Sequence, residues 1–292
     1  MRIISWNMNS VRARLPRLSA LLHRHKPDLV CLQETRVADD DGFPIMQLSA
    51  AGYHTLLHGQ PSHNGVAILV HTPERRYDLW SFADSSHQVA NPLQGLRIPK
   101  EVQCGFPNDP VPKEARVISA CIGKLRLVNV YVVNGQERES YQFKLKQTWM
   151  SALGKWLRSL PDMPPLLVVG DFNIAPDNRD VWDPEGLVDR IHCTDEERAW
   201  LKDLQGNRLL DLLRVKTEES GVYTWWPYQR DAFERDEGLR FDLALGDVAV
   251  AKNVTRVWVD REERRPSGKI GPSDHAPLII DFTESDAVTM HG

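Results

Sequence analysis

Short runs of apolar residues, separated by polar residues, glycine, asparagine and proline, recur along the whole chain of 292 residues. Several of these runs are rich in valine and isoleucine and are bounded by turn-forming residues, which is typical of β-strands. Strands are therefore predicted at residues 3–6, 29–32, 66–70, 117–121, 125–133, 166–169, 243–245, 254–259 and 278–282.

Helical periodicity marks fewer segments. Residues 11–25 and 141–160 each place apolar side chains three or four positions apart, so each predicts an amphipathic helix. A shorter helix is predicted at 196–204. The order begins strand–helix–strand, but many later strands follow one another without helices. This pattern predicts a mixed α/β fold rather than a steady βαβ alternation.

Two long segments lack a sustained pattern and are predicted to be surface loops. Residues 71–113 are mostly polar and contain prolines at 73, 92, 99, 107, 110 and 112, and residues 173–225 are expected to carry one or two short helices. Long loops in a compact domain are often functional. Because strand patterns resume on both sides of each loop, we expect one catalytic domain over residues 1–283 and a frayed tail over 284–292.

Composition narrows the class of protein. The chain is 41% hydrophobic and 26% charged, which is ordinary for a globular enzyme. No apolar run approaches the roughly 20 residues of a membrane span, the first residues do not form a secretory signal, and the four cysteines contain no C-x-x-C pair. These features favour a cytoplasmic protein that has no membrane span, no disulfide framework and no zinc site.

Polar side chains stand at the ends of the predicted strands or interrupt them. A lone residue of this kind is usually a turn former or helix cap, which is the interpretation favoured for Asn9 and Ser10. Taken together, however, the set indicates a site at one rim of a sheet, because strand ends bring side chains from distant segments together. The set is Asn7, Glu34, Asn129, Tyr131, Asp171, Asn173, Asp242, Asp274 and His275.

The chemistry of this set favours a hard divalent cation. Mg²⁺ takes one or two protein carboxylates and completes its shell with water and substrate phosphate, and Glu34 is the first candidate ligand. Carboxylates packed together also need a cation or protons to offset their repulsion. A metal, a base for water and donors to phosphate oxygens would together form a site for phosphoryl chemistry.

The same residues carry a resemblance to the endonuclease/exonuclease/phosphatase superfamily, and within it to the exonuclease III branch of bacterial DNA-repair nucleases. The resemblance implies a four-layer α/β sandwich, in which two facing mixed β-sheets are flanked by helices and the site lies at one edge between the sheets. The matching segments run in the family's order and include Ser5-Trp6-Asn7-Met8-Asn9-Ser10, Leu32-Gln33-Glu34-Thr35, His58-Gly59-Gln60, Gly170-Asp171-Phe172-Asn173, Tyr223-Thr224-Trp225-Trp226, Gly238-Leu239-Arg240-Phe241-Asp242 and Ser273-Asp274-His275.

The resemblance implies a role for each residue that matches the motif. It implies Mg²⁺, with Mn²⁺ as an alternative, held by Glu34 with help from Asn7 and Asp274. It also implies that Asp171 orients or deprotonates the attacking water, and that Asn173 hydrogen-bonds the phosphate or that water.

The remaining implied roles concern the phosphate. His275, paired with Asp242, is expected to donate to a non-bridging oxygen, and Tyr131 is expected to contact the phosphate or the leaving oxygen. The implied reaction is hydrolysis of a DNA phosphodiester without a covalent intermediate. It would serve as a 3′–5′ exonuclease, a 3′-phosphatase or 3′-phosphodiesterase, and an apurinic/apyrimidinic endonuclease. The expected partner is double-stranded DNA with 3′ ends or abasic sites, bound by a monomer.

Four further residues are candidate substrate contacts: Trp225, Trp182, Lys146 and Arg116. Of Trp225 and Trp226, one is expected in the core, and Trp225 is preferred for the site, where it would pack on an abasic sugar or a terminal base. A large indole at Trp182 would exclude a flipped abasic nucleotide while admitting a frayed 3′ end, although packing of the loop explains it equally well.

Net charge does not decide the partner. The formal charge of -4, from 36 Lys+Arg and 40 Asp+Glu, disfavours nucleic acid at first sight. Without the four carboxylates of the predicted site, 40 - 4 leaves 36 acidic residues, which equals the number of basic ones. Two alternatives stay open: a phosphodiesterase or phosphatase of the same superfamily acting on RNA or a phospholipid head group, and a catalytically inactive nucleic-acid-binding module.

Overall fold

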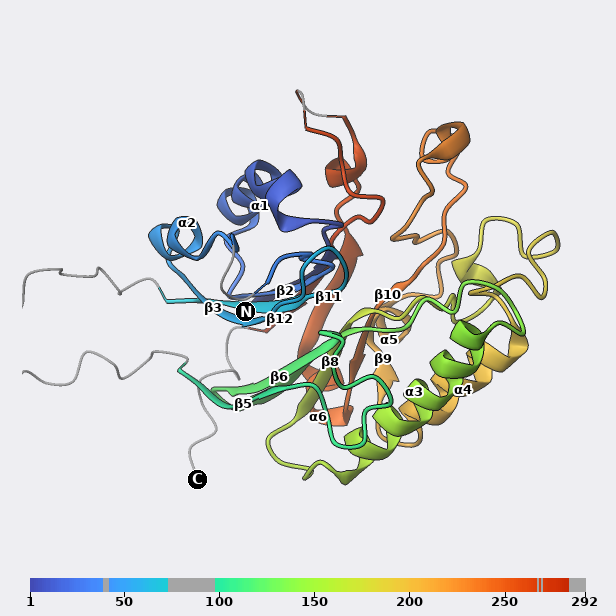
Figure 1. The fold of residues 1–292 in the computed structure, drawn as a ribbon, viewed down its shortest axis with the longest axis horizontal. Helices are drawn as coiled ribbons and strands as arrows, with labels where there is room; N and C mark the ends of the chain where they lie inside the picture. Colours follow the sequence, from blue (N-terminus) through green and yellow to red (C-terminus); the bar gives the residue numbers. More distant parts are fainter. Residues whose placement is uncertain (39–41, 73–97, 267, 269, 284–292) are drawn as a thin grey trace, which may run out of the picture.

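Two six-stranded β-sheets face one another in the computed structural model, which describes residues 1–38, 42–72, 98–266, 268 and 270–283 (Figure 1). The first sheet has the order β11-β12-β1-β2-β4-β3, and its one parallel pair is β1–β2. Its strands are β1 (Arg2–Asn7), β2 (Leu29–Gln33), β3 (Tyr53–His58), β4 (Val66–His71), β11 (Val254–Val259) and β12 (Leu278–Phe282).

The second sheet has the order β5-β6-β7-β8-β10-β9, and its one parallel pair is β7–β8. Each sheet is therefore mixed, as the resemblance implies. Its strands are β5 (Pro99–Cys104), β6 (Val117–Ile122), β7 (Leu125–Tyr131), β8 (Leu166–Asp171), β9 (Leu210–Asp211) and β10 (Asp242–Gly246).

Helices cover the outer face of each sheet, which gives four layers (Figure 1). α1 (Val11–His25) and α2 (Ile45–Ala50) pack on the first sheet, where Leu18, Leu21 and Leu48 join an apolar cluster with Ile4 and Leu69. α3 (Tyr141–Ser159) and α4 (Asp195–Gln205) pack on the second sheet, and a third cluster fills the space between the sheets. The predicted sandwich is confirmed.

The remaining helical elements lie in connections. They are η1 (Asn178–Asp180), α5 (Leu212–Lys216), η2 (Gln229–Asp231), α6 (Val248–Asn253) and η3 (Arg261–Arg264). The predicted loop at 173–225 thus holds η1, α4, β9 and α5, which is more regular structure than the sequence indicates.

The prediction of a loop over residues 71–113 is partly wrong. Residues 99–104 of the segment 71–113 form the edge strand β5, and residues 73–97 lie outside the described residues. The predicted tail at 284–292 also lies outside them. No helix in the described ranges is long and apolar enough to cross a membrane.

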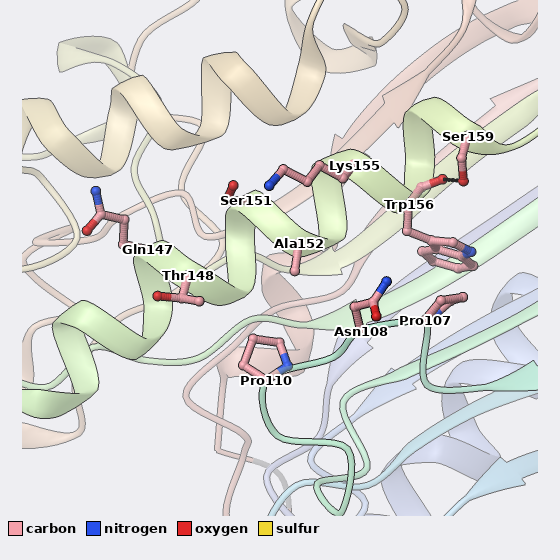
Figure 2. Close-up of a pocket in the computed structure, with 10 residues that line it drawn as sticks. All are labelled: Pro107, Asn108, Pro110, Gln147, Thr148, Ser151, Ala152, Lys155, Trp156 and Ser159. Carbon is pink, nitrogen blue, oxygen red and sulfur yellow. Dashed lines mark hydrogen bonds between the residues drawn. The ribbon is translucent and has the colours of Figure 1, made fainter.

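A cavity of about 740 Å³ lies between α3 and the loop after β5, lined by Pro107, Asn108, Pro110 and side chains of α3 that include Lys155 and Trp156 (Figure 2). Its one charged lining residue is Lys155, and none of the predicted site residues lines it. The candidate active site therefore lies at the strand ends and not in this cavity.

Candidate active site at the edge between the sheets

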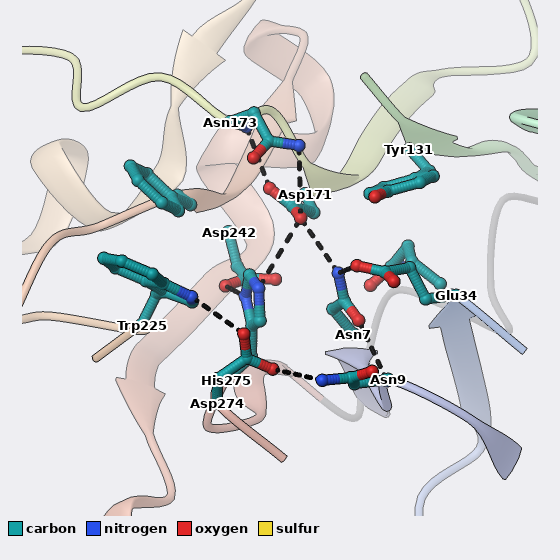
Figure 3. Close-up of polar contacts among 12 residues, drawn as sticks. Asn7, Asn9, Glu34, Tyr131, Asp171, Asn173, Trp225, Asp242, Asp274 and His275 are labelled. Carbon is teal, nitrogen blue, oxygen red and sulfur yellow. Dashed lines mark hydrogen bonds and ion pairs between the residues drawn. The ribbon is translucent and has the colours of Figure 1, made fainter. Parts of the chain in front are cut away.

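Strand register brings three predicted site residues into one row. Tyr131 at the end of β7 lies opposite Asp171 at the end of β8, and Asp171 lies opposite Asp242 at the start of β10. In the first sheet Asn7 ends β1 opposite Gln33, and Glu34 follows. The two facing sheets thus present their polar ends to the same space (Figure 3).

Strand β8, which ends at Asp171, can lie close to β7 because it carries a glycine. Gly170 has φ +146°, and a Cβ atom there would collide with the carbonyl oxygen of Val130. Any larger residue would push β8 away from β7. Gly170 therefore helps to set the distance between Asp171 and Tyr131.

Asn7 joins the two sheets through its side chain. Its Nδ2 donates to Glu34 Oε1 at 2.8 Å and to Asp171 Oδ2 at 2.9 Å, and the residue is fully buried. Ser273 fixes the main chain here, because its hydroxyl donates to the carbonyl oxygen of Asn7 at 2.7 Å. Glu34 itself adopts a left-handed backbone with φ 48°, which is uncommon for a glutamate and is found where surrounding structure holds a residue in place.

His275 stands between two carboxylates. Its Nδ1 lies 2.8 Å from Asp242 Oδ2, and its Nε2 lies 3.7 Å from Asp171 Oδ2 (Figure 3). Burial disfavours the charged ring, but the negative charges of Asp242 and Asp171 outweigh it and raise the pKa of His275 to about 10. The imidazole is therefore a charged donor at neutral pH.

Asp171 is almost completely buried among polar groups. Burial raises the pKa of Asp171 to about 7, helped by the charge of Asp242 and opposed by that of His275. Its Oδ1 accepts from the main-chain N–H of Asn173 at 2.8 Å. Asn173 has a left-handed φ of 51°, and its Nδ2 donates to the carbonyl oxygen of Val132 at 3.0 Å.

Asp274 is held on both oxygens. Trp225 Nε1 donates to Oδ2 at 3.1 Å, and Asn9 Nδ2 donates to Oδ1 at 3.0 Å. Burial disfavours its charged form, but His275 and the hydrogen bonds from Asn9 and Trp225 outweigh burial and lower the pKa of Asp274. The N–H of Asn9 also donates to Asn7 Oδ1 at 3.0 Å, so Asn9 connects Asp274 to Asn7.

Comparison with known proteins shows the family of this chain. Residues 4–275 match the Endonuclease/Exonuclease/phosphatase family. The chain belongs to this family. It is 30% identical to "Exodeoxyribonuclease III" of Haemophilus influenzae, over 97% of this chain and 100% of that protein.

Solved members of the family share the fold. The 3′-5′ exonuclease NExo from Neisseria meningitidis is 36% identical, with a TM-score of 0.84 over 97% of this chain and 99% of that one. The same values hold for the 3′ phosphatase NExo from Neisseria bound to a product DNA hairpin. An AP endonuclease from Archaeoglobus fulgidus is 29% identical, with a TM-score of 0.83 over 97% of this chain and 99% of that one.

The oxygen donors suit the metal that the family implies. In the part of the chain that the structure describes, no three His, Cys, Asp or Glu side chains form a metal cage of their own. Mg²⁺ needs no such cage, because it binds through one or two carboxylates and keeps water and phosphate in its shell. The Glu34 carboxylate, with the Asn7 side chain bonded to it, fits that requirement. Arg36, which pairs with Glu34, balances its charge.

Two further predicted substrate residues differ in exposure, because the Arg116 side chain is only 12% exposed and pairs with Glu114, whereas Trp182 is largely exposed. Arg116 lies over the ring of Tyr131 at 5.0 Å, and its Nη1 donates to the carbonyl oxygen of Tyr131 at 3.3 Å. Trp182 is 42% exposed, and its main-chain N–H donates to the carbonyl oxygen of Gly238. The next residue, Leu239, bridges to Trp225. Burial together with the charges of Glu34 and Asp171 raises the pKa of Tyr131, so its hydroxyl stays protonated.

Trp225 and Trp226 differ as predicted in their burial. Trp226 is fully buried, while Trp225 is half-buried and stacks on Phe241 with ring centroids 5.0 Å apart.

The prediction that Lys146 contacts the substrate is wrong. The Lys146 side chain is fully buried, and its ammonium pairs with Glu197, which is buried too. A lysine in this position cannot reach a DNA backbone. The expectation treated its charge as a surface signal, although burial with a partner is the other way a protein accommodates a charge.

Several residues around the site escape the sequence analysis. Asn9 was predicted as a turn former, yet its side chain also holds Asp274, while Ser10 does cap α1. Arg36 pairs with Glu34 and follows the matching segment Leu32-Gln33-Glu34-Thr35 directly. Asn134 and His192 both contact Asn173. Asn134 stands at the end of an apolar run, where the strand-end criterion would find it, whereas no sequence pattern singles out His192.

Proposed function

We propose that this chain is a Mg²⁺-dependent DNA-repair nuclease of the exonuclease III type, which hydrolyses phosphodiesters at 3′ ends, at blocked 3′ termini and on the 5′ side of abasic sites. The observation that carries the proposal is the meeting of Asn7, Asp171 and His275 from three distant segments within hydrogen-bond or ion-pair distance. The names of the similar proteins support DNA as the substrate: an exodeoxyribonuclease, a 3′ phosphatase with product DNA and an AP endonuclease.

In this proposal, Glu34 holds the metal with help from Asn7 and Asp274. Bound Mg²⁺ supplies positive charge that offsets the negative phosphate. Asn7 has a second task, since its Nδ2 fixes Asp171 and Glu34 relative to each other. The site would then keep the carboxylate that holds the metal apart from the one that faces water.

Asp171 orients the attacking water or removes its proton. Its Oδ1 is occupied by the N–H of Asn173, and its Oδ2 faces the Asn7 amide and the His275 ring. This leaves the carboxylate held rigidly beside the place where a phosphate would meet His275. Asn173 adds a hydrogen bond to the phosphate or to the water.

His275 donates from Nε2 to a non-bridging phosphate oxygen. Asp242 accepts from Nδ1, which fixes the orientation of the ring and stabilises its charge. Tyr131 remains a protonated donor and contacts the phosphate or the leaving oxygen, with Arg116 beside its ring. Trp225 offers a face for an abasic sugar or a terminal base.

A panel of labelled duplexes tests the proposal. Duplexes with a recessed 3′ end, a 3′-phosphate or a single abasic site are incubated with the protein and Mg²⁺ or EDTA, and products are resolved by gel. We expect turnover with Mg²⁺ on at least one DNA substrate and loss of all turnover in EDTA, because the phosphate charge is then not offset. Turnover that survives EDTA, or DNA binding without any cleavage, contradicts the proposal.

Matched RNA duplexes and a phosphoinositide in the same series separate the alternatives. Preference for either of these over every DNA substrate would favour another phosphodiesterase or phosphatase of the family.

A further inference from the structure

Lys146 makes contacts that a salt bridge alone does not need. It lies on the buried stripe of α3 with Phe143, Met150 and Leu153. Besides pairing with Glu197, its Nζ donates to the carbonyl oxygen of Asn173 at 2.7 Å and to that of Asn134 at 3.4 Å. Each of the three ammonium hydrogens therefore has an acceptor, which fixes the direction of the group.

The two carbonyls belong to residues that also contact each other. Asn134 Nδ2 donates to Asn173 Oδ1 at 3.0 Å. Lys146 thus holds the main chain of both residues, and one of them holds the side chain of the other. The Asn173 side-chain amide is therefore held directly by Asn134 and, through the main chain, by Lys146.

His192 adds a second donor to the same atom. Its Nδ1 lies 2.6 Å from the carbonyl oxygen of Asn173, and a carbonyl only accepts, so the proton belongs to the ring. Burial, together with the charge of Lys146, lowers the pKa of His192 to about 3, so the ring is neutral. Two donors therefore converge on a residue whose left-handed backbone must be held in place.

Glu197 connects this arrangement to α4. One carboxylate oxygen receives Lys146, and the other accepts from the hydroxyl of Thr194 at 2.8 Å. Thr194 is the N-cap of α4, so the start of that helix carries the ion pair. Side chains of helices α3 and α4 therefore both help to hold Asn173 in position.

Stability does not explain a charge pair at this depth. Removing two charges from water costs free energy that their attraction often fails to recover, and apolar replacements of similar size are often neutral or stabilising. What an apolar pair cannot do is donate to the carbonyls of Asn173 and Asn134.

We propose that Lys146, together with His192, is a positioning residue that holds the Asn173 carbonyl and so sets where the Asn173 amide meets the substrate. This inference rests on the proposed nuclease function.

The test is the double variant Lys146→Met/Glu197→Gln, which removes both charges and leaves at position 197 an amide oxygen that can still accept from Thr194. We expect kcat on a recessed 3′ end to fall by about 10- to 100-fold, the loss typical of a displaced catalytic group. KM for DNA and its dependence on salt should not change, whereas a lost phosphate contact would lower the salt slope by about 0.9. Lys144→Met, an exposed lysine of the same helix, is the control and should match wild type.

A mutant cycle with Asn173→Ala identifies an effect that passes through Asn173. In that background the double variant should cost less than about twofold more, because interacting residues are not additive. Additive losses, an unchanged kcat or an altered salt slope would each overturn the inference. If the double variant does not fold, His192→Phe replaces it in the same cycle with the same expectation.

The cycle also separates the two levels of the account. Full activity of Asn173→Ala would refute the role of Asn173 in the proposed function. An impaired Asn173→Ala beside a fully active Lys146→Met/Glu197→Gln would refute only the positioning role.

Discussion

At the scale of single residues, two tryptophans near the site differ in how their rings are held. Trp225 is fixed by stacking on Phe241 and by its hydrogen bond to Asp274. Trp182 is 42% exposed and is tied through its main chain to Gly238. Val181 and Trp225 both bridge to Leu239, so the segment that carries Leu239 lies between the segments that carry Trp182 and Trp225.

This arrangement predicts that Trp182 affects the balance of activities. Replacing it with glycine should raise the rate of abasic-site cleavage roughly tenfold, the order of one pocket contact, while 3′ exonuclease activity changes little. Single-turnover rates on an abasic duplex and a recessed duplex measure this ratio. Val188→Gly, another exposed apolar residue of the same connection, serves as the control. An abasic-site rate unchanged by Trp182→Gly leaves the ring with a packing role only.

The sequence identifies the residues at strand ends well, because their polarity interrupts apolar runs. It misplaces Lys146, whose charge favours a surface position. Yet positions 143, 146, 150, 153 and 157 are spaced by three or four, so the helical stripe itself includes Lys146. Its partner Glu197 lies 51 positions away, and no local pattern reveals such a pairing.

At the scale of elements, the central strands and the edge strand β11 were predictable, and the other three edge strands were not. The nine predicted strands all exist, and the three missed ones, β3, β5 and β9, each lie at a sheet edge. β5 is mostly exposed and β9 has only two residues, so neither shows an apolar run. Which sheet a strand joins is also set by long-range pairing, and the layer arrangement came from the family resemblance instead.

A buried arginine links three elements below the site. Arg240 bonds both oxygens of Asp180 in η1, at 2.6 and 3.0 Å, and Asp211 in β9 at 2.7 Å. Its side chain is 1% exposed, and the attraction of the two carboxylates outweighs burial and raises its pKa. The guanidinium therefore ties the connection that carries Trp182 to the second sheet.

Arg240→Met should lower the free energy of unfolding by about 3–5 kcal/mol, because it removes the fully buried cation from both carboxylates and leaves Asp180 with Arg214 alone. Urea denaturation followed by circular dichroism measures the change. Arg235→Met removes an exposed pair with Glu237 and should shift the value by less than about 1 kcal/mol. Equal effects of the two variants would show that burial of the Arg240 network adds nothing.

At the scale of the whole molecule, four of the 40 acidic residues meet at the edge between the two sheets. Asp171 and Asp242 are buried, and Glu34 and Asp274 lie beside them. The net charge of -4 equals the contribution of these four carboxylates, so it does not argue against the proposed DNA substrate. We therefore expect a bound cation to help a phosphate approach the site.

In the proposed function, this edge hydrolyses a DNA phosphodiester with Asp171 acting on water. The most direct test of this role is the single-turnover rate on a recessed 3′ end with Mg²⁺, for wild type and for Asp171→Asn of verified fold. Asp203→Asn, an exposed carboxylate of α4, is the control. We predict a loss of at least about 10²-fold for Asp171→Asn, as expected for a general base, and none for the control. Equal rates for wild type and Asp171→Asn would contradict the account.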